Sequence, residues 1–146
     1  MKQKHGSKNC LAVCAAMAFK CKLREVENYF ESSKKNGIAK FIDFGFHKGY
    51  HVGYVFIKPV ILFGKIISTY DIKTFPALII VESAYNKKET HALYWGPNEL
   101  LKMQIWDPDP GVDNARNIKE YEIIGWYPIV ELKQTTGKKV YNIYSE

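Results

Sequence analysis

Cys10 is the residue of this sequence best placed to act as a nucleophile. It follows Asn9, a good helix N-cap residue, and the run 10–20 contains neither glycine nor proline. At the first turn of a helix, unpaired backbone N–H groups and the helix dipole favour a thiolate over a thiol. Cys14 and Cys21 lie further along, where packing as small apolar residues is the simpler interpretation. The sequence therefore predicts one reactive cysteine.

A thiolate nucleophile also needs a base and a group that orients the base. His91 opens a predicted strand at 90–95, and the next predicted strand, 101–106, runs directly into Asp107. If the two strands form a hairpin around residues 96–98, their distant ends pair and bring Asp107 beside His91. The spacing therefore predicts His91 as the base and Asp107 as its orienter, and it favours Asp107 over Asp109, which lies between two prolines.

Gln3 is the candidate oxyanion donor. The charge that develops on an attacked carbonyl oxygen needs preorganised hydrogen-bond donors. The side-chain amide of Gln3 and the backbone N–H of Cys10, an unpaired donor at the helix start, can supply them. A single glutamine near a terminus is usually exposed, so this role depends on the other three residues.

The elements that must position these residues follow an order of helices and then strands. Leu11, Cys14, Ala15 and Ala18 share one apolar face of the first helix, and its many alanines indicate a central position. A second helix is expected at about 23–32 and ends by Asn36-Gly37, whereas the segment 38–50 is ambiguous. Strands are expected at 52–57, 60–67, 76–82, 90–95, 101–106, 123–132 and 139–144. This order predicts an α+β fold with helices packed on an antiparallel sheet.

Taken in order, Gln3, then Asn9-Cys10 at a helix start, a strand with His91 and then Asp107-Pro108 resemble the papain-like cysteine peptidases. The closer resemblance is to the C39-type branch, whose members process leader peptides in bacteriocin export, and to its small stand-alone relatives in phages and bacteria. The resemblance implies a papain-like fold, a thiol protease (hydrolase) activity without a cofactor, and a peptide or protein substrate. It assigns Cys10 as nucleophile, His91 as base, Asp107 as orienter and Gln3 as oxyanion donor. The matching segments are 3–19, 76–95 and 105–111.

Composition indicates one globular domain over residues 1–146, with 47% apolar, 25% charged and 14% aromatic residues. No stretch approaches the ~20 apolar residues of a membrane-spanning helix, and no secretory h-region is visible. Three cysteines argue against a disulfide framework and favour a reduced, cytoplasmic protein, in the bacterial host if phage-encoded.

The net charge of +6 permits a nucleic acid, an anionic membrane surface or an acidic protein as partner and selects none. Nucleic acid is disfavoured because only Tyr85 with Lys87 and Lys88 combines an aromatic with basic residues.

Other functions use parts of the same pattern. A deamidase or acyl transferase needs the same triad. A binding protein on a peptidase-like scaffold, such as a phage-type inhibitor or adaptor, would also carry the family's spacing, and the relatives often have Asp-Cys-Gly where this chain has Asn9-Cys10-Leu11. A zinc site formed by Cys10, Cys14, His47 and His51 is disfavoured because the intervening length is wrong for a compact finger. His5 is a weaker base candidate than His91, because no strand ending in aspartate follows it.

Overall fold

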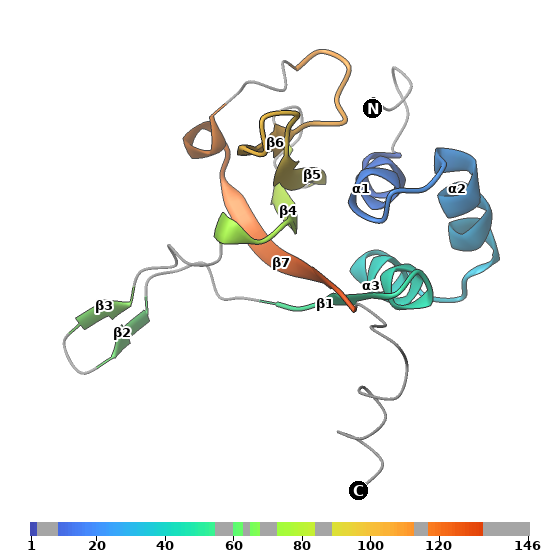
Figure 1. The fold of residues 1–146 in the computed structure, drawn as a ribbon, viewed down its shortest axis with the longest axis horizontal. Helices are drawn as coiled ribbons and strands as arrows, with labels where there is room; N and C mark the ends of the chain where they lie inside the picture. The colour runs from blue at the N-terminus through green and yellow to red at the C-terminus, as the bar shows by residue number, and fades with distance from the viewer. Residues whose placement is uncertain are drawn as a thin grey trace, which may run out of the picture.

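A computed structural model of the chain describes residues 1–2, 9–54, 60–62, 65–67, 73–83, 89–112 and 117–132. Within these residues, three helices precede all the strands (Figure 1): α1 (Cys10–Ala18), α2 (Leu23–Ser32) and α3 (Ile38–His47). Five strands form one antiparallel sheet in the order β1-β7-β4-β5-β6. Their bounds are Tyr50–Val52 for β1, Ala77–Glu82 for β4, Thr90–Pro97 for β5, Met103–Trp106 for β6 and Ile123–Glu131 for β7. The predicted α+β class is confirmed.

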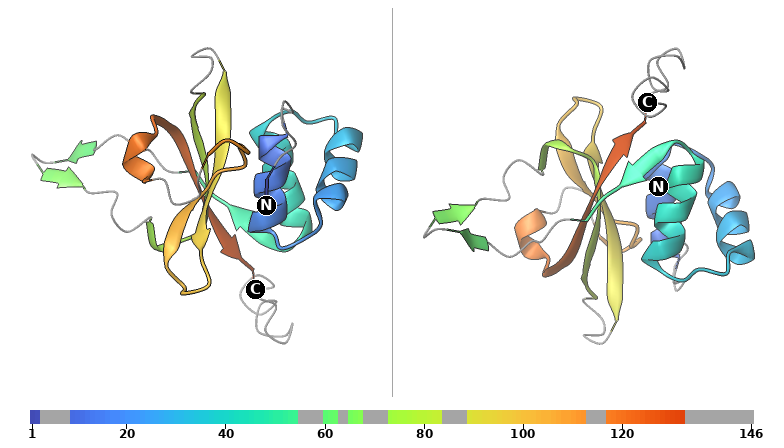
Figure 2. Two further views of the ribbon diagram at one scale, coloured as in Figure 1. Left: turned by 90° about the horizontal axis from the view of Figure 1, so that it is seen from above. Right: turned by 90° about the horizontal axis from the view of Figure 1, so that it is seen from below.

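The three helices lie on one face of the sheet (Figure 2), and α1 is the innermost of them. The apolar face predicted for α1 includes too few residues. Ala12, Val13 and Ala16 are as buried as the predicted Cys14, Ala15 and Ala18, whereas Leu11 is only half-buried. The cause is that α1 contacts β5 as well as α2 and α3, so apolar side chains are needed all round it.

A second apolar cluster lies on the other face of the sheet. It consists of the buried residues Ala77, Ile79, Val81, Leu93, Ile105 and Trp126. Ile118 and Tyr121 pack against it from the short 3₁₀ helix Ile118–Glu120 and the residue that follows this helix. Figure 2 shows this short helix on the side of the sheet away from α1, α2 and α3. The sheet is therefore covered on both faces.

Two glycines explain where the helix predictions were incomplete. The helix predicted at about 23–32 is confirmed as α2, and Gly37, at a φ of +54°, directly precedes α3. Gly45 lies inside α3, although a glycine weakens a helix prediction. A Cβ atom at Gly45 would lie 2.6 Å from Cζ of Phe19, so the close packing of this ring on α3 requires a glycine.

The strand predictions are correct for most of the sheet and wrong at 60–67. Val60–Leu62 (β2) pairs antiparallel with Lys65–Ile67 (β3), so this run is two strands of a separate pair. The prediction of one continuous strand did not anticipate the antiparallel pairing of Leu62 with Lys65. At the strand expected at 52–57, β1 ends at Val52, residues 53 and 54 are not in a strand, and residues 55–57 lie outside the described residues. The strand expected at 139–144 lies outside the described residues.

Across the part of the chain that the structure describes, no helix combines the length and the apolar character needed to cross a lipid bilayer.

Candidate active site

Cys10 is the first residue of α1, as predicted; it is partly buried and packs against the core that α1 forms with the sheet. The helix begins with the hydrogen bond from Val13 N to Asn9 O, at 3.1 Å. Asn9 occupies the N-cap position, but its side chain makes no cap hydrogen bond to α1. The Asn9 amide instead donates to Glu27 Oε2 at 3.2 Å and connects α1 to α2. The predicted helix start is thus confirmed, whereas the predicted side-chain cap is wrong.

The surroundings of Cys10 favour its thiolate. Burial raises the pKa of the thiol, but a hydrogen bond with the His91 side chain, backbone hydrogen bonds from Ala92 and Leu11, and the charge of His91 together bring the pKa below its ordinary value. Ala92 follows His91 on β5, so one short stretch of strand supplies two of these contacts. The neighbouring Cys14 is fully buried, and this burial raises the pKa of its thiol well above the ordinary value. One cysteine of the helix is therefore activated and the other is not.

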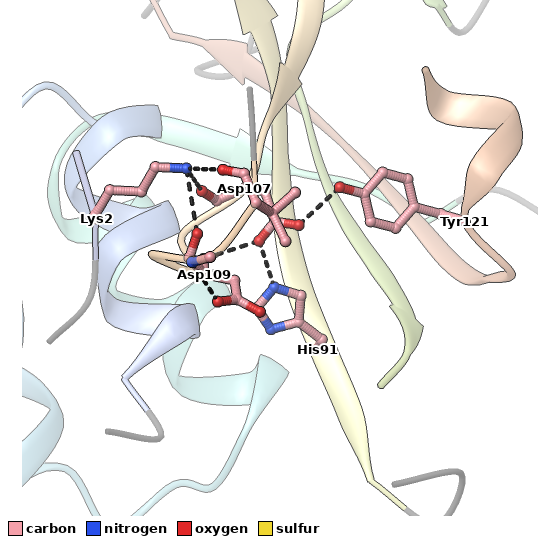
Figure 3. Close-up of polar contacts among 7 residues, drawn as sticks. Lys2, His91, Asp107, Asp109 and Tyr121 are labelled. Carbon is pink, nitrogen blue, oxygen red and sulfur yellow. Dashed lines mark hydrogen bonds and ion pairs between the residues drawn. The ribbon is translucent and has the colours of Figure 1, made fainter. Parts of the chain in front are cut away.

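His91 lies between Cys10 and Asp107. Its Nε2 is 2.6 Å from Oδ1 of Asp107 (Figure 3). The hydrogen bond between His91 and Cys10 is therefore left to the other ring nitrogen, Nδ1. Burial lowers the pKa of His91, but the hydrogen bonds and charges of Asp107 and Cys10 outweigh burial and raise the pKa to about 9. The pKa of Cys10 is lowered and that of His91 is raised, so both shifts favour the thiolate–imidazolium form of the pair.

The β5–β6 hairpin brings Asp107 to His91, as the spacing predicts. Trp95 pairs with Ile105 and Tyr94 with Trp106, so Asp107 follows directly on the ladder. The turn lies slightly later than expected: Gly96 and Pro97 still belong to β5, and Asn98 N donates to Lys102 O at 2.9 Å. This difference lengthens the hairpin but keeps its register, so the predicted proximity of Asp107 and His91 is confirmed.

Asp107 is buried, with only 1% of its surface exposed, and is surrounded by donors. Its Oδ1 also accepts from the backbone N–H of Asp109 at 2.9 Å, and its Oδ2 accepts from the Tyr121 hydroxyl at 2.7 Å (Figure 3). Burial raises the pKa of Asp107, but the hydrogen bonds from His91, Tyr121 and Asp109 outweigh burial and lower the pKa below its usual value. The buried carboxylate is therefore kept ionised.

Tyr121 and Lys2 belong to this site, and the sequence interpretation missed both. The ammonium of Lys2 donates to the carbonyl oxygens of Asp107 (2.6 Å), Asp109 (3.3 Å) and Val112 (2.8 Å), and so holds the loop that carries the aspartate. Sequence offers no signal for that contact. The sequence does indicate the short 3₁₀ helix before Tyr121, because Asn117 and Glu120 have the spacing of a capping box. In the structure their side chains and backbones form the mutual hydrogen bonds of that motif.

The other residues considered for the site lie elsewhere. Gln3 and His5 fall outside the described residues. Asp109 turns its carboxylate to the backbone N–H of Gly111, at 2.9 Å. His47 stacks on Tyr29 at the end of α3, and His51 is exposed on β1. Within the described segments, no three or more histidine, cysteine, aspartate or glutamate side chains come together in a way that could hold a metal ion.

No protein-family model matches the chain, and no curated protein matches it in sequence. The functional assignment therefore depends on the geometry of Cys10, His91 and Asp107.

Proposed function

We propose that this chain is a thiol hydrolase of papain-like fold that cleaves a peptide or isopeptide bond. The observation that carries the proposal is the position of His91 between Cys10 at the start of α1 and the buried Asp107. Each member comes from a different element, and each has the environment its role requires: a thiol of lowered pKa, a base of raised pKa and an ionised carboxylate.

In the first half of the reaction, the Cys10 thiolate attacks the carbonyl carbon, and the carbonyl electron pair moves to oxygen. When the tetrahedral intermediate collapses, the carbon–nitrogen bond breaks and the imidazolium of His91 gives its proton to the leaving amine. The result is a thioester on Cys10. Asp107 holds the His91 ring in place and stabilises its charge throughout.

In the second half, His91 takes a proton from water, which attacks the thioester. The carbon–sulfur bond then breaks, and the thiolate returns. Donors for the oxyanion are available at the start of α1, because the first N–H groups of a helix have no acceptor within it. Gln3 remains the predicted second donor. If an amine replaces water, the same steps give acyl transfer, so the reaction product distinguishes the two activities.

Three features support the fold, the compartment and the substrate class of this proposal. An α-helical layer that precedes an antiparallel sheet, with Cys10 at a helix start and His91 on a strand, is the arrangement that the papain-like resemblance implies. The cysteines Cys10, Cys14 and Cys21 are all free, which fits a reducing compartment such as the cytoplasm. A thiolate nucleophile acts on carbonyl groups without a cofactor, which fits a peptide or protein substrate.

A peptide library tests the proposal. We expect the chain to cleave a subset of peptides and the Cys10→Ala variant to cleave none, because the thiols of Cys14 and Cys21 both have a raised pKa. The Cys21→Ala variant is the matched control and should keep wild-type cleavage, since the pKa of Cys21 is raised by burial and by Glu25. Cleavage by Cys10→Ala at the wild-type rate would contradict the proposal. Intact peptides with undiminished binding of a protein partner by Cys10→Ala would favour the binding-protein alternative.

A further inference from the structure

Tyr121 reaches the active-site carboxylate from the opposite face of the sheet. It follows the 3₁₀ helix Ile118–Glu120, and its ring packs with the second apolar cluster, away from α1. Its hydroxyl nevertheless donates to Asp107 Oδ2 at 2.7 Å. Figure 3 shows Tyr121 and His91 meeting the same carboxylate from different elements. The site therefore draws on both layers that cover the sheet.

The two oxygens of Asp107 have different partners. Oδ1 faces His91 Nε2 at 2.6 Å and the N–H of Asp109 at 2.9 Å, and Oδ2 faces the hydroxyl of Tyr121. A carboxylate can rotate about its terminal torsion, which is broad and has no strong intrinsic preference. A donor on Oδ2, held by a ring in a packed core, fixes that rotation and keeps Oδ1 directed at His91.

We propose that Tyr121 is a positioning residue of the triad, which fixes the Asp107 carboxylate toward His91 and so maintains the thiolate of Cys10. The inference rests on the proposed function for the meaning of the triad, but its test requires no substrate. The chain of contacts runs from Tyr121 to Asp107, then to His91 and then to Cys10.

The electrostatics of the site agree with this assignment. The Asp107 carboxyl has a lowered pKa in spite of its burial, and the Tyr121 hydrogen bond is one of the causes. Asp107 in turn raises the pKa of His91, and His91 lowers that of Cys10. Loss of the hydroxyl should therefore let Asp107 take up a proton at a higher pH and weaken the thiolate–imidazolium pair at its acidic limit.

The test is the rate at which iodoacetamide alkylates Cys10, measured by mass spectrometry as a function of pH. For Tyr121→Phe, which keeps the ring, we expect the acidic limb of the profile to move up by about one pH unit. Tyr29→Phe is the matched control, because Tyr29 donates to Asp43 Oδ2 at the same 2.7 Å and neither residue is among the groups that shift the pKa of Cys10. Its profile should superimpose on that of the wild type.

Three outcomes would overturn the proposal. The first is a Tyr121→Phe profile identical to the wild type in a variant with wild-type circular dichroism. The second needs no variant: an Asp107 carboxyl carbon that titrates by NMR in the wild type at or above about pH 3.9, the value of an unperturbed aspartate. The third is a wild-type protein whose Cys10 reacts no faster than Cys21, which would overturn the proposed function as well.

Discussion

Two tyrosine–aspartate pairs in this protein have the same geometry and different surroundings. In the candidate active site, Tyr121 donates to Asp107 Oδ2 at 2.7 Å. Between α2 and α3, Tyr29 donates to Asp43 Oδ2 at 2.7 Å. The side chain of Asp107 is 2% exposed, whereas that of Asp43 is 36% exposed. The second partner also differs: Asp107 contacts His91, and Asp43 contacts Lys35 at 3.0 Å.

The comparison shows that burial, rather than the contact itself, determines what an aspartate can do to its neighbours. Both carboxyls have a lowered pKa, Asp107 against the opposing effect of burial and Asp43 mainly through Tyr29 and Lys35. Water and salt screen the charge of Asp43, so it acts on little beyond its own partners. The charge of Asp107 acts in a low-dielectric site, where it helps to raise the pKa of His91 to about 9.

The largest difference between the two regions should come from removing each carboxylate charge. For Asp107→Asn we expect cleavage of a peptide substrate to fall by about 10²- to 10⁴-fold, because His91 loses its orienter and its stabilising charge. Asp43→Asn neutralises a carboxylate with an equally short tyrosine contact and should leave the rate unchanged. The measurement is kcat/KM for one peptide from the library, and equal effects of the two substitutions would refute the comparison.

The next difference concerns the pH dependence of stability. The folded-state pKa of His91, about 9, lies above the unfolded value of about 6.5, so its stabilisation is complete below pH 6.5 and is lost as the pH rises through 9. The raised pKa of His91 corresponds to at most about 3.5 kcal/mol. Urea unfolding at several pH values should show this decline in the wild type and a smaller one in His91→Gln. Asp43→Asn should retain the wild-type decline, and a decline that survives in His91→Gln would exclude His91 as its cause.

A smaller effect is expected when each tyrosine hydroxyl is removed. Tyr121→Phe should lower the free energy of unfolding by about 1.5–3 kcal/mol, because a buried carboxylate loses a hydrogen bond. Tyr29→Phe should produce no change that urea unfolding can resolve, because water replaces the lost donor on the exposed Asp43. Equal losses in the two variants would mean that burial is not the deciding difference.

The smallest effect belongs to the exposed Lys35–Asp43 ion pair. Lys35→Met should change the urea midpoint slightly at low salt, and the change should vanish at about 0.5 M NaCl, since exposed charges are screened. The acidic limb of Cys10 alkylation should not follow this salt dependence, because Asp107 and His91 are shielded from solvent. If salt shifted the acidic limb of the Cys10 alkylation profile as strongly as it reduces the effect of Lys35→Met on the urea midpoint, the active site would be shown to be solvated.

The sequence was sufficient for the parts of the site that depend on local order. The β5–β6 hairpin could be predicted because a short connection fixes the register of two antiparallel strands, and with it the proximity of Asp107 to His91. The start of α1 was also predictable from Asn9 and the helix-forming run after it. The hydrogen bond of the Asn9 side chain could not be predicted, because its partner, Glu27, lies on another helix, α2.

The contributions of Tyr121 and Lys2 could not be predicted for a different reason. Both depend on the tertiary arrangement: Tyr121 reaches Asp107 from the far face of the sheet, and Lys2 holds the loop after β6. Neither contact has a periodic or spacing pattern in the chain. A buried aspartate does imply that donors must be present, but hydrophobic periodicity does not say which residues supply them.

The most direct test of the thiolate at Cys10 is competitive alkylation of the three cysteines of the native protein by iodoacetamide near pH 6. The lowered pKa of Cys10 and the raised values of Cys14 and Cys21 predict that Cys10 is modified first, with Cys21 slower and the buried Cys14 unmodified. Selective labelling of Cys10 that is lost in Asp107→Asn would support the triad. Labelling of Cys10 no faster than that of Cys21 would contradict it.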